Sequence, residues 1–302
     1  MGSELLYLNG SFLPLSEGRI EVEDRGFQLG DGVYEVIKVM NGCLVWLADH
    51  LARLERSLAA VRLTEAAVGH ELEEILPRLV REAGVAYGSV YVQVTRGPAP
   101  REFIFPRPPR PTVLAYVRPS EPPTPAEILA GVALHPVEDL RWARCDIKST
   151  NLLAAVLAKE EAKEAGADEA LFLGPGGVVR EGGSSNVFAF LGGVLRTHPL
   201  SNRILAGITR LHVLRIARRE GIPVEEREFS LTEITEQAPA DCEVFTASTT
   251  KDLRPVVRVG DQVIGDGRPG PVTLRLLDLF RREQALLVGL EPPPALTSRL
   301  QG

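Results

Sequence analysis

The N-terminal part of the chain alternates apolar and polar positions in short runs that are joined by tight turns. LLYL and SFLPL flank Asn9-Gly10, and GVYEVIKVM and CLVWL flank Asn41-Gly42, a dipeptide that favours hairpins. Apolar residues at three- and four-residue spacing then predict helices over 49–61 and 71–82, followed by a strand in SVYVQVTRG. Strands followed by clustered helices indicate an α+β domain.

A polar, proline-rich stretch, RPSEPPTPAE, interrupts this pattern. It predicts an N-terminal α+β domain over 1–118, a linker over 119–125 and a C-terminal mixed α/β domain over 126–302. The second domain is expected to contain strands in GVALHPV, EALFLG, GVVREG, NVFAFLGGVLRT, VFTAS and VVRVGDQVIGDG. Helices are expected after Lys148, over about 209–221 and near the C-terminus.

Composition narrows the function to small-molecule chemistry. A chain of 302 residues with 44% hydrophobic residues exceeds the usual size of a single core, which agrees with two domains. The net charge of -6 with interspersed signs argues against nucleic acid and anionic membranes as partners. Cys43, Cys145 and Cys242 are widely spaced, which indicates reduced thiols rather than disulfides or a metal site. Without a long apolar run, a cytoplasmic location is expected.

Lys148 is the first candidate for chemistry, in RWARCDIKSTNLLAAVLAKEEA. Ser149 and Thr150 are interpreted as the start of a helix, and a lysine at its positive end beside apolar Ile147 should lose its proton readily. Schiff-base chemistry requires such a lysine. Taken alone, the position is more simply explained by an ordinary solvated lysine with a buried stem.

Glu181 is the second candidate, because VVREGGSSNVFAF places it at a strand end before a glycine and serine turn. A buried carboxylate there could keep a pyridine nitrogen protonated, so that the ring accepts electrons from a substrate carbanion. A solvated turn carboxylate is the competing interpretation.

A third group of residues forms a candidate phosphate site. The backbone N–H of Ile208 and the hydroxyl of Thr209 precede the helical run LHVLRIARREG, where a helix N-terminus favours an anion. Ser248 and Thr249 follow a strand and could complete the site, and Arg53 could supply the countercharge. Plain N-capping is the alternative for the helix start. A lysine, a carboxylate and a phosphate site are together what a pyridoxal phosphate enzyme requires.

These segments resemble the fold-type IV pyridoxal-phosphate enzymes, and among them the D-amino acid aminotransferases. The resemblance extends over nearly the whole chain, through DRGFQLGDGVYEVIKVMNG, VYVQVTRG, RWARCDIKSTNLLAAVLAKEEA, EGGSSNVFAF, THPLSNRILAGITR and TASTTKDLRPV. It implies a two-domain fold-type IV transferase fold of α+β and α/β character, with pyridoxal 5'-phosphate as cofactor and no metal.

The resemblance also implies a role for each candidate. Lys148 is implied as the Schiff-base lysine and proton carrier, and Glu181 as the partner of the pyridine nitrogen. Leu205 is implied as the apolar support of the ring, with a site assembled from both domains. The implied phosphate contacts are Arg53, Ile208, Thr209, Ser248 and Thr249.

Substrate residues follow from the same resemblance. Tyr34 and Arg141 match residues that line the substrate and cofactor pocket. Arg101, in PAPREFIFP, matches an arginine that holds the substrate α-carboxylate and comes from the neighbouring subunit, which implies a homodimer. The sequence departs from the family at Phe103, where a histidine is usual. The carboxylate site has thereby lost a hydrogen-bond donor and gained an apolar ring. Either Arg101 suffices together with Tyr34, or the pocket favours apolar amino donors, including (R)-primary amines.

The resulting hypothesis is a ping-pong transaminase that moves the amino group of a D-amino acid, of the D-alanine or D-glutamate type, to a 2-oxo acid such as 2-oxoglutarate. A branched-chain L-amino acid aminotransferase, an aminodeoxychorismate lyase and a non-catalytic cofactor-binding protein are the alternatives. The preferred donor, its stereochemical strictness and assemblies beyond a dimer lie outside what this sequence determines.

Overall fold

The computed structural model describes residues 5–64, 69–236, 238 and 241–297. The chain divides into two compact units, and each groups segments that are distant in sequence. Unit 1 comprises Met1–Pro122, Ile147–Asn151 and Leu287–Leu290, and unit 2 comprises Pro123–Asp146, Leu152–Leu286 and Glu291–Gly302. The chain passes between the units within the predicted linker, 119–125. The division differs from the prediction of one domain over 126–302, because the segment that carries Lys148 groups with unit 1.

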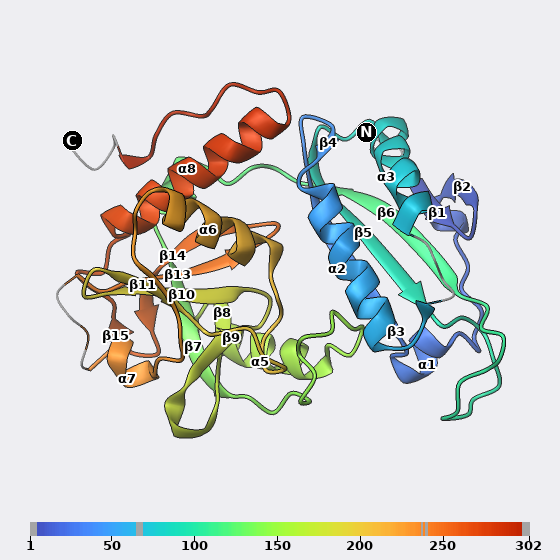
Figure 1. Ribbon diagram of the computed structural model, residues 1–302, viewed down its shortest axis with the longest axis horizontal. Helices are drawn as coiled ribbons and strands as arrows, with labels where there is room; N and C mark the ends of the chain where they lie inside the picture. The colour runs from blue at the N-terminus through green and yellow to red at the C-terminus, as the bar shows by residue number, and fades with distance from the viewer. Residues whose placement is uncertain (1–4, 65–68, 237, 239–240, 298–302) are drawn as a thin grey trace. The chain divides into compact units, whose positions relative to one another are not determined.

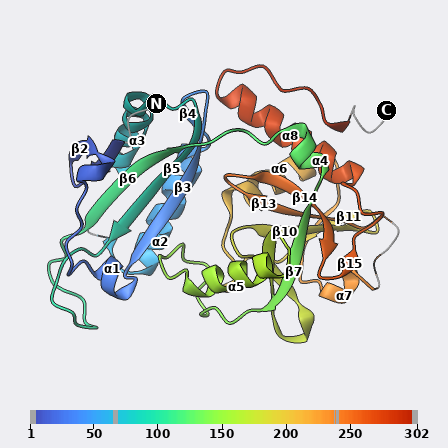
Figure 2. The same cartoon turned by 180° about the vertical axis from the view of Figure 1, so that it is seen from behind.

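Unit 1 is built on a six-stranded sheet with the order β2-β1-β6-β5-β3-β4. Helices α2 and α3 pack on one face of this sheet (Figures 1 and 2). The elements of this unit are β1 (Leu5–Leu8), β2 (Ser11–Pro14), α1 (Arg25–Leu29), β3 (Gly32–Met40), β4 (Cys43–Leu44), α2 (Leu47–Ala60), α3 (Gly69–Ala83), β5 (Tyr87–Thr95) and β6 (Thr112–Pro119).

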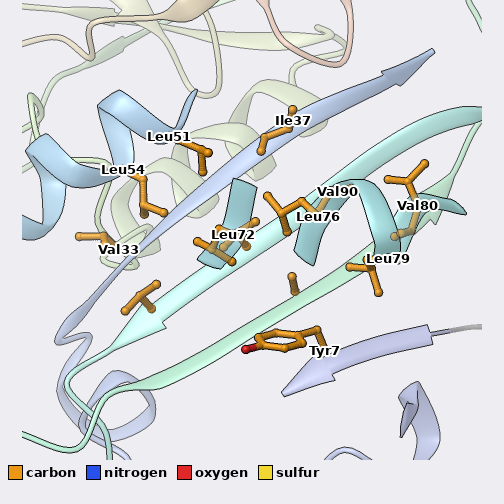
Figure 3. Packing of buried hydrophobic residues seen from close by; sticks show 14 of the residues in the cluster. Tyr7, Val33, Ile37, Leu51, Leu54, Leu72, Leu76, Leu79, Val80 and Val90 are labelled. Atoms are coloured by element: carbon orange, nitrogen blue, oxygen red, sulfur yellow. The ribbon is translucent and has the colours of Figure 1, made fainter. Parts of the chain in front are cut away.

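The core of unit 1 lies between the helices and the sheet (Figure 3). Leu54 of α2 and Leu76 of α3 meet Val33, Ile37 and Val90 from the strands, and all five side chains are fully buried. Burying a side chain of this size contributes about 2 kcal/mol relative to leaving it exposed. The alternation along β3 and β5 therefore fixes which face of the sheet the helices cover, and leaves Tyr34 on the opposite face.

Unit 2 contains a nine-stranded sheet with the order β12-β11-β10-β13-β14-β7-β8-β9, and β15 pairs with β14. Its strands are β7 (Val132–Glu138), β8 (Glu169–Leu173), β9 (Val179–Gly182), β10 (Asn186–Leu191), β11 (Val194–Thr197), β12 (Val224–Glu226), β13 (Glu243–Ser248), β14 (Asp252–Val259) and β15 (Gln262–Val263). Its helices are α4 (Pro125–Leu129), α5 (Leu153–Glu164), α6 (Ile208–Arg219), α7 (Leu231–Ile234) and α8 (Pro271–Leu287, of which the last residue groups with unit 1).

A further pairing closes the sheet of unit 2 on itself, because β9 also contacts β10 through Glu181 and Asn186. Helix α5 packs against β7 and β8, and α6 packs against β13. Helix α8 runs beside α6 (Figure 1), and ion pairs join Arg219 to Glu283 and Arg275 to Glu220. The closure of the sheet brings the strand end that carries Glu181 next to the start of β10.

Strand β6 and the start of α5 are among the local features that differ from the sequence prediction. Strand β6 was not predicted, although Val113, Ala115 and Val117 alternate along it; it pairs with β5 over the full length of β6 and separates β5 from β1. The predicted helix start at Ser149 and Thr150 is wrong, because α5 begins at Leu153. No helix in the described part of the chain is long and apolar enough to cross a membrane.

Candidate active site

Lys148 lies in an irregular segment beside the first residues of β3. Its carbonyl accepts a hydrogen bond from the Tyr34 N–H at 2.9 Å, and the Thr150 N–H donates to the Gly32 carbonyl at 3.0 Å. The preceding Ile147 is part of the core of unit 1. Lys148 is therefore held by a β-bridge and by packing, and not by the helix N-terminus that the sequence predicted, since α5 starts only at Leu153.

The ammonium group of Lys148 lies over an aromatic ring. Its Nζ is 4.3 Å from the centroid of the Tyr34 ring, within the range of a cation–π contact. Tyr34 stacks on Tyr91 with ring centroids 5.6 Å apart, and Tyr91 donates a hydrogen bond to Gln93 Oε1 at 2.6 Å. Tyr34 is thus fixed by its neighbours, and it gives the Lys148 side chain a defined wall.

Arg53 is paired inside unit 1 with a carboxylate that the sequence reasoning missed. Its Nε and Nη2 donate to the two oxygens of Glu35, at 2.7 and 2.8 Å. His50, one turn earlier on α2, contacts Glu35 Oε2 through Nδ1 at 2.8 Å. All three side chains are buried. The sequence did contain a signal, because Glu35 alternates with Val33 and Ile37 on the face of β3 that the helices cover.

The surroundings of Glu35 and His50 set the protonation state of each side chain. Burial raises the pKa of Glu35, but Arg53 and then His50 outweigh burial and hold that pKa at about 2. Burial lowers the pKa of His50 more than Glu35 raises it, so His50 is neutral at pH 7. An ionised carboxylate only accepts hydrogen bonds, and His50 therefore carries its proton on Nδ1. The cluster orients the Arg53 guanidinium rigidly, as an anion-binding arginine requires.

Glu181 occupies the centre of the candidate site in unit 2. Arg141 Nη1 donates to its Oε1 at 2.6 Å, and both Asn186 Nδ2 and the Leu205 N–H donate to its Oε2, at 3.1 and 3.0 Å. Asn186 also donates to the Leu205 carbonyl at 3.0 Å. These bonds fix the carboxylate and tie Leu205 to it. With three of about four acceptor positions filled, Oε1 can still accept a hydrogen bond from a ring N–H.

Arg141 is shared between two carboxylates. Its Nε and Nη2 donate to Asp139 at 2.9 and 3.0 Å, and Arg180 donates to the same carboxylate at 2.7 Å. Burial raises the pKa of Glu181 to about 7, since the attraction of Arg141 opposes burial without cancelling it. Asp139, by contrast, has a lowered pKa because Arg141 and Arg180 outweigh its burial. A protonated ring nitrogen next to Glu181 would favour the ionised form of this carboxylate and offset its burial.

The residues of the candidate anion site lie at the start of α6 and at the end of β13. Gly207 is the N-cap, and Ile208 and Thr209 open the helix, where backbone N–H groups lack partners within the helix. A Cβ atom on Gly207 would lie 2.0 Å from Asn186 Oδ1, so glycine is required for this close approach. Ser248 ends β13 and Thr249 follows in the turn to β14.

These residues could hold a group that carries both an anion, at the start of α6, and a protonated ring nitrogen, at Glu181. Ser185, near Glu181 in sequence, offers a further polar group, because its buried Oγ has no hydrogen-bond partner among the described residues. An unpaired buried hydroxyl is costly unless a ligand group meets it. The residues of unit 2 thus fit a phosphorylated pyridine.

Arg101 and Phe103 lie in the connection between β5 and β6, outside the clusters described above. Both side chains are exposed, Phe103 by 86%, and the guanidinium carbon of Arg101 is 5.9 Å from the Phe103 ring centroid. A separate cavity of about 520 Å³ in unit 1 is lined partly by Asp24, Phe27 and Thr150. Its lining includes none of the predicted site residues, so it is not the site described here.

Comparisons with known proteins agree with this chemistry. Residues 32–259 match the family model of amino-transferase class IV. A D-alanine aminotransferase from Bacillus licheniformis is 43% identical over 88% of this chain and 92% of its own length. Another, from Staphylococcus haemolyticus, is 38% identical over 92% of this chain and 96% of its own length. The structure of a branched-chain amino acid aminotransferase from T.th., with pyridoxamine 5'-phosphate, superposes with a TM-score of 0.85 at 28% identity, covering 96% of each chain.

The fold and these residues define a pyridoxal-phosphate-dependent aminotransferase of fold type IV, an enzyme that acts on an amino acid and a 2-oxo acid. The chain belongs to the amino-transferase class IV family. The cofactor, when bound, supplies the electron-accepting ring that stabilises negative charge at the substrate carbon.

Proposed function

We propose that this enzyme transfers the amino group of a D-amino acid, of the D-alanine or D-glutamate type, to a 2-oxo acid such as 2-oxoglutarate. The observation that carries the proposal is the 38–43% identity to D-alanine aminotransferases over most of both chains. The structurally similar branched-chain enzyme is only 28% identical. A cytoplasmic enzyme is proposed with it, since all three cysteines are free.

The residues of unit 1 have two proposed roles. Lys148 Nζ holds and moves the proton of the substrate α-carbon, because a lysine positioned by backbone bonds and an aromatic wall can donate and accept in one fixed direction. Arg53, oriented by Glu35 and His50, binds the phosphate group. Tyr34 lines the substrate side of Lys148.

The residues of unit 2 hold the ring. Glu181 accepts the hydrogen bond of the protonated pyridine nitrogen, Leu205 supports the ring, and Ile208, Thr209, Ser248 and Thr249 bind the phosphate. Arg141 was assigned to the pocket lining by resemblance. Because its nitrogens face Glu181 and Asp139, we assign it instead to the orientation of Glu181.

A homodimer completes the proposed enzyme. The exposed Arg101 would bind the substrate α-carboxylate in the site of the partner subunit, with Phe103 beside the substrate side chain. A guanidinium binds a carboxylate through two parallel hydrogen bonds, which fixes the face of the substrate that meets Lys148. Arg101 thereby selects the D-enantiomer.

The proposal is tested by visible absorption of the cofactor-loaded enzyme during separate additions of D-alanine, L-leucine and (R)-1-phenylethylamine, without an acceptor. We expect D-alanine to bleach the cofactor band. Bleaching by L-leucine alone would assign a branched-chain enzyme instead, and bleaching by the amine alone would assign an amine transaminase. Release of pyruvate from aminodeoxychorismate without an acceptor would indicate the lyase, and a spectrum that no donor changes would indicate a non-catalytic protein.

Phe103→His should raise the ratio of kcat/KM for D-alanine to that for (R)-1-phenylethylamine roughly tenfold, because it restores a hydrogen-bond donor and removes an apolar ring. Parallel initial rates with the two donors measure this ratio. Ile104→His is the matched control, since Ile104 is the next residue in the same exposed segment and is itself 78% exposed. An unchanged ratio in Phe103→His would mean that Phe103 does not face the substrate.

A further inference from the structure

The connection 96–111 carries Arg101 and Phe103, and its base is tightly closed. Gly97 has a positive φ of 81°, and a Cβ atom there would lie 1.7 Å from the Arg110 carbonyl oxygen. The two legs of the loop are therefore in direct contact just beyond the last pair of β5 and β6, Thr95 and Thr112. This closure fixes the base of the loop but leaves the position of its exposed tip undetermined.

A buried charge cluster lies beside the base of this loop. The Asp31 carboxylate accepts hydrogen bonds from Arg25 Nε at 2.8 Å and from Arg96 Nε and Nη2 at 2.8 and 3.0 Å. The two arginine side chains are only 3% and 2% exposed. Burying a guanidinium group is costly unless hydrogen-bond partners satisfy it. One carboxylate does not satisfy two buried guanidinium groups, so these arginines need further partners.

Further partners come from the end of α2. Arg96 Nη2 and Nη1 donate to the carbonyls of Val61 and Arg62 at 2.7 and 3.2 Å. Carbonyls at a helix C-terminus carry partial negative charge, which offsets the second guanidinium. Arg96 is thereby held by Asp31 and the helix end together, and Arg25 remains oriented by Asp31.

Both arginines reach the loop from this fixed position. Arg25 Nη1 donates to the Glu102 carbonyl at 2.5 Å, and the guanidinium carbon of Arg96 lies 3.7 Å from the Phe105 ring centroid. These contacts hold the residues on either side of Phe103. The side chains of the loop tip are exposed, whereas its backbone is tied to a buried arginine 77 residues away in sequence.

We propose that Arg25, oriented by Asp31, is a positioning residue for substrate recognition: it holds the loop that carries Arg101 and Phe103, and Arg96 supports the same loop through Phe105. The proposal rests on the proposed function, in which Arg101 binds the substrate α-carboxylate. A loop held at Glu102 presents Arg101 in one orientation, so less conformational freedom is lost when the carboxylate binds.

Limited proteolysis of the cofactor-loaded enzyme tests the tether directly. Trypsin does not cut before proline, so Arg107-Pro108 and Arg110-Pro111 resist it, and the susceptible bond within 97–111 is Arg101–Glu102. Cleavage there separates 1–101 from 102–302. We expect Arg25→Met to be cut at this bond roughly tenfold faster than the unmodified protein, because a hydrogen bond from a charged donor is lost.

Steady-state kinetics test the consequence for recognition. For Arg25→Met we expect the KM for D-alanine to rise roughly tenfold while kcat changes less than about threefold, since substrate binding and not the proton transfer is weakened. Phe105→Ala should shift both readouts in the same direction by a smaller factor. Arg107→Met, which removes an exposed arginine of the same loop, is the matched control and should change neither.

The outcomes separate the inference from the proposed function. Arg25→Met leaves Asp31 paired with Arg96, and thermal unfolding checks that the variant is folded. The inference is overturned if Arg25→Met and Phe105→Ala are cut faster at Arg101–Glu102 but keep the KM for D-alanine. It is also overturned if neither variant is cut faster. In both cases the proposed function stands. If the unmodified enzyme transaminates L-leucine and no D-amino acid, the proposed function fails, and the role of the tether in D-substrate recognition fails with it.

Discussion

Lys148→Ala should lower kcat for D-alanine transamination by roughly 10⁴-fold, the upper range of what a positioned proton-transfer group contributes. The physical reason is its fixed placement, with its carbonyl bonded to the Tyr34 N–H and its Nζ over the Tyr34 ring. Together these two contacts set the direction in which Nζ can deliver a proton. Single-turnover rates with D-alanine and the cofactor-loaded protein measure the loss.

Two further measurements separate a lost proton carrier from a damaged fold. Borohydride reduction of the cofactor-loaded protein should attach the cofactor covalently to the peptide that contains Lys148, and this attachment should be absent in Lys148→Ala. Lys163→Ala is the matched control, because that side chain is 77% exposed and pairs with a neighbouring glutamate on α5. A variant that retained a tenth or more of the kcat would rule out Lys148 as the proton carrier.

Glu181→Gln should lower kcat by about 10²- to 10³-fold, the usual effect of removing one preorganised charge from an active site. Glutamine keeps the size of the side chain and can still contact Asn186 and Leu205, but it cannot hold a ring nitrogen in its protonated form. Asp139→Asn provides a comparison, because it leaves Glu181 in place and weakens the ion pairs that Asp139 makes with Arg141 and Arg180. A kcat in Glu181→Gln within a factor of about three of the original would exclude the pyridine contact.

The free energy of unfolding of the cofactor-free protein should depend on pH through Glu181. Burial raises the pKa of Glu181 from 4.5 to about 7, so the folded state holds this proton more tightly than the unfolded state. Its contribution to stability is therefore fully present below about pH 4.5 and is lost as the pH rises through about 7. Between about pH 5 and pH 8, Glu181→Gln should lose less of its free energy of unfolding than the unmodified protein does, by roughly 2.5 kcal/mol. Urea unfolding at both pH values measures this difference.

Three carboxylates of this enzyme show how environment sets function. Glu35 has a full partner in Arg53, so its pKa stays near 2 and it serves as a fixed negative support. Glu181 shares Arg141 with Asp139 and remains undercompensated. Only the undercompensated carboxylate gains from an additional positive charge, which is why it suits a pyridinium partner and Glu35 does not.

The sequence alone determined the features that depend on local pattern and on family motifs. Apolar spacing predicted two helices of unit 1, α2 and α3, and Asn-Gly pairs predicted the turns before β2 and β4. The motifs around Lys148, Glu181 and Thr209 indicated the fold type, the cofactor and the reaction. These signals are local because helix periodicity, turn preference and motif spacing each act over a few neighbouring residues.

Only the tertiary structure decided which groups the candidate residues contact. The partner of Arg53 is Glu35, 18 residues away, the partner of Glu181 is Arg141, 40 residues away, and Arg25 reaches Glu102 across 77 residues. The segment with Lys148 is flanked in sequence by residues of unit 2, but it packs on β3 in unit 1. Such pairings depend on how strands are ordered in a sheet and where a loop closes, and no local periodicity encodes either.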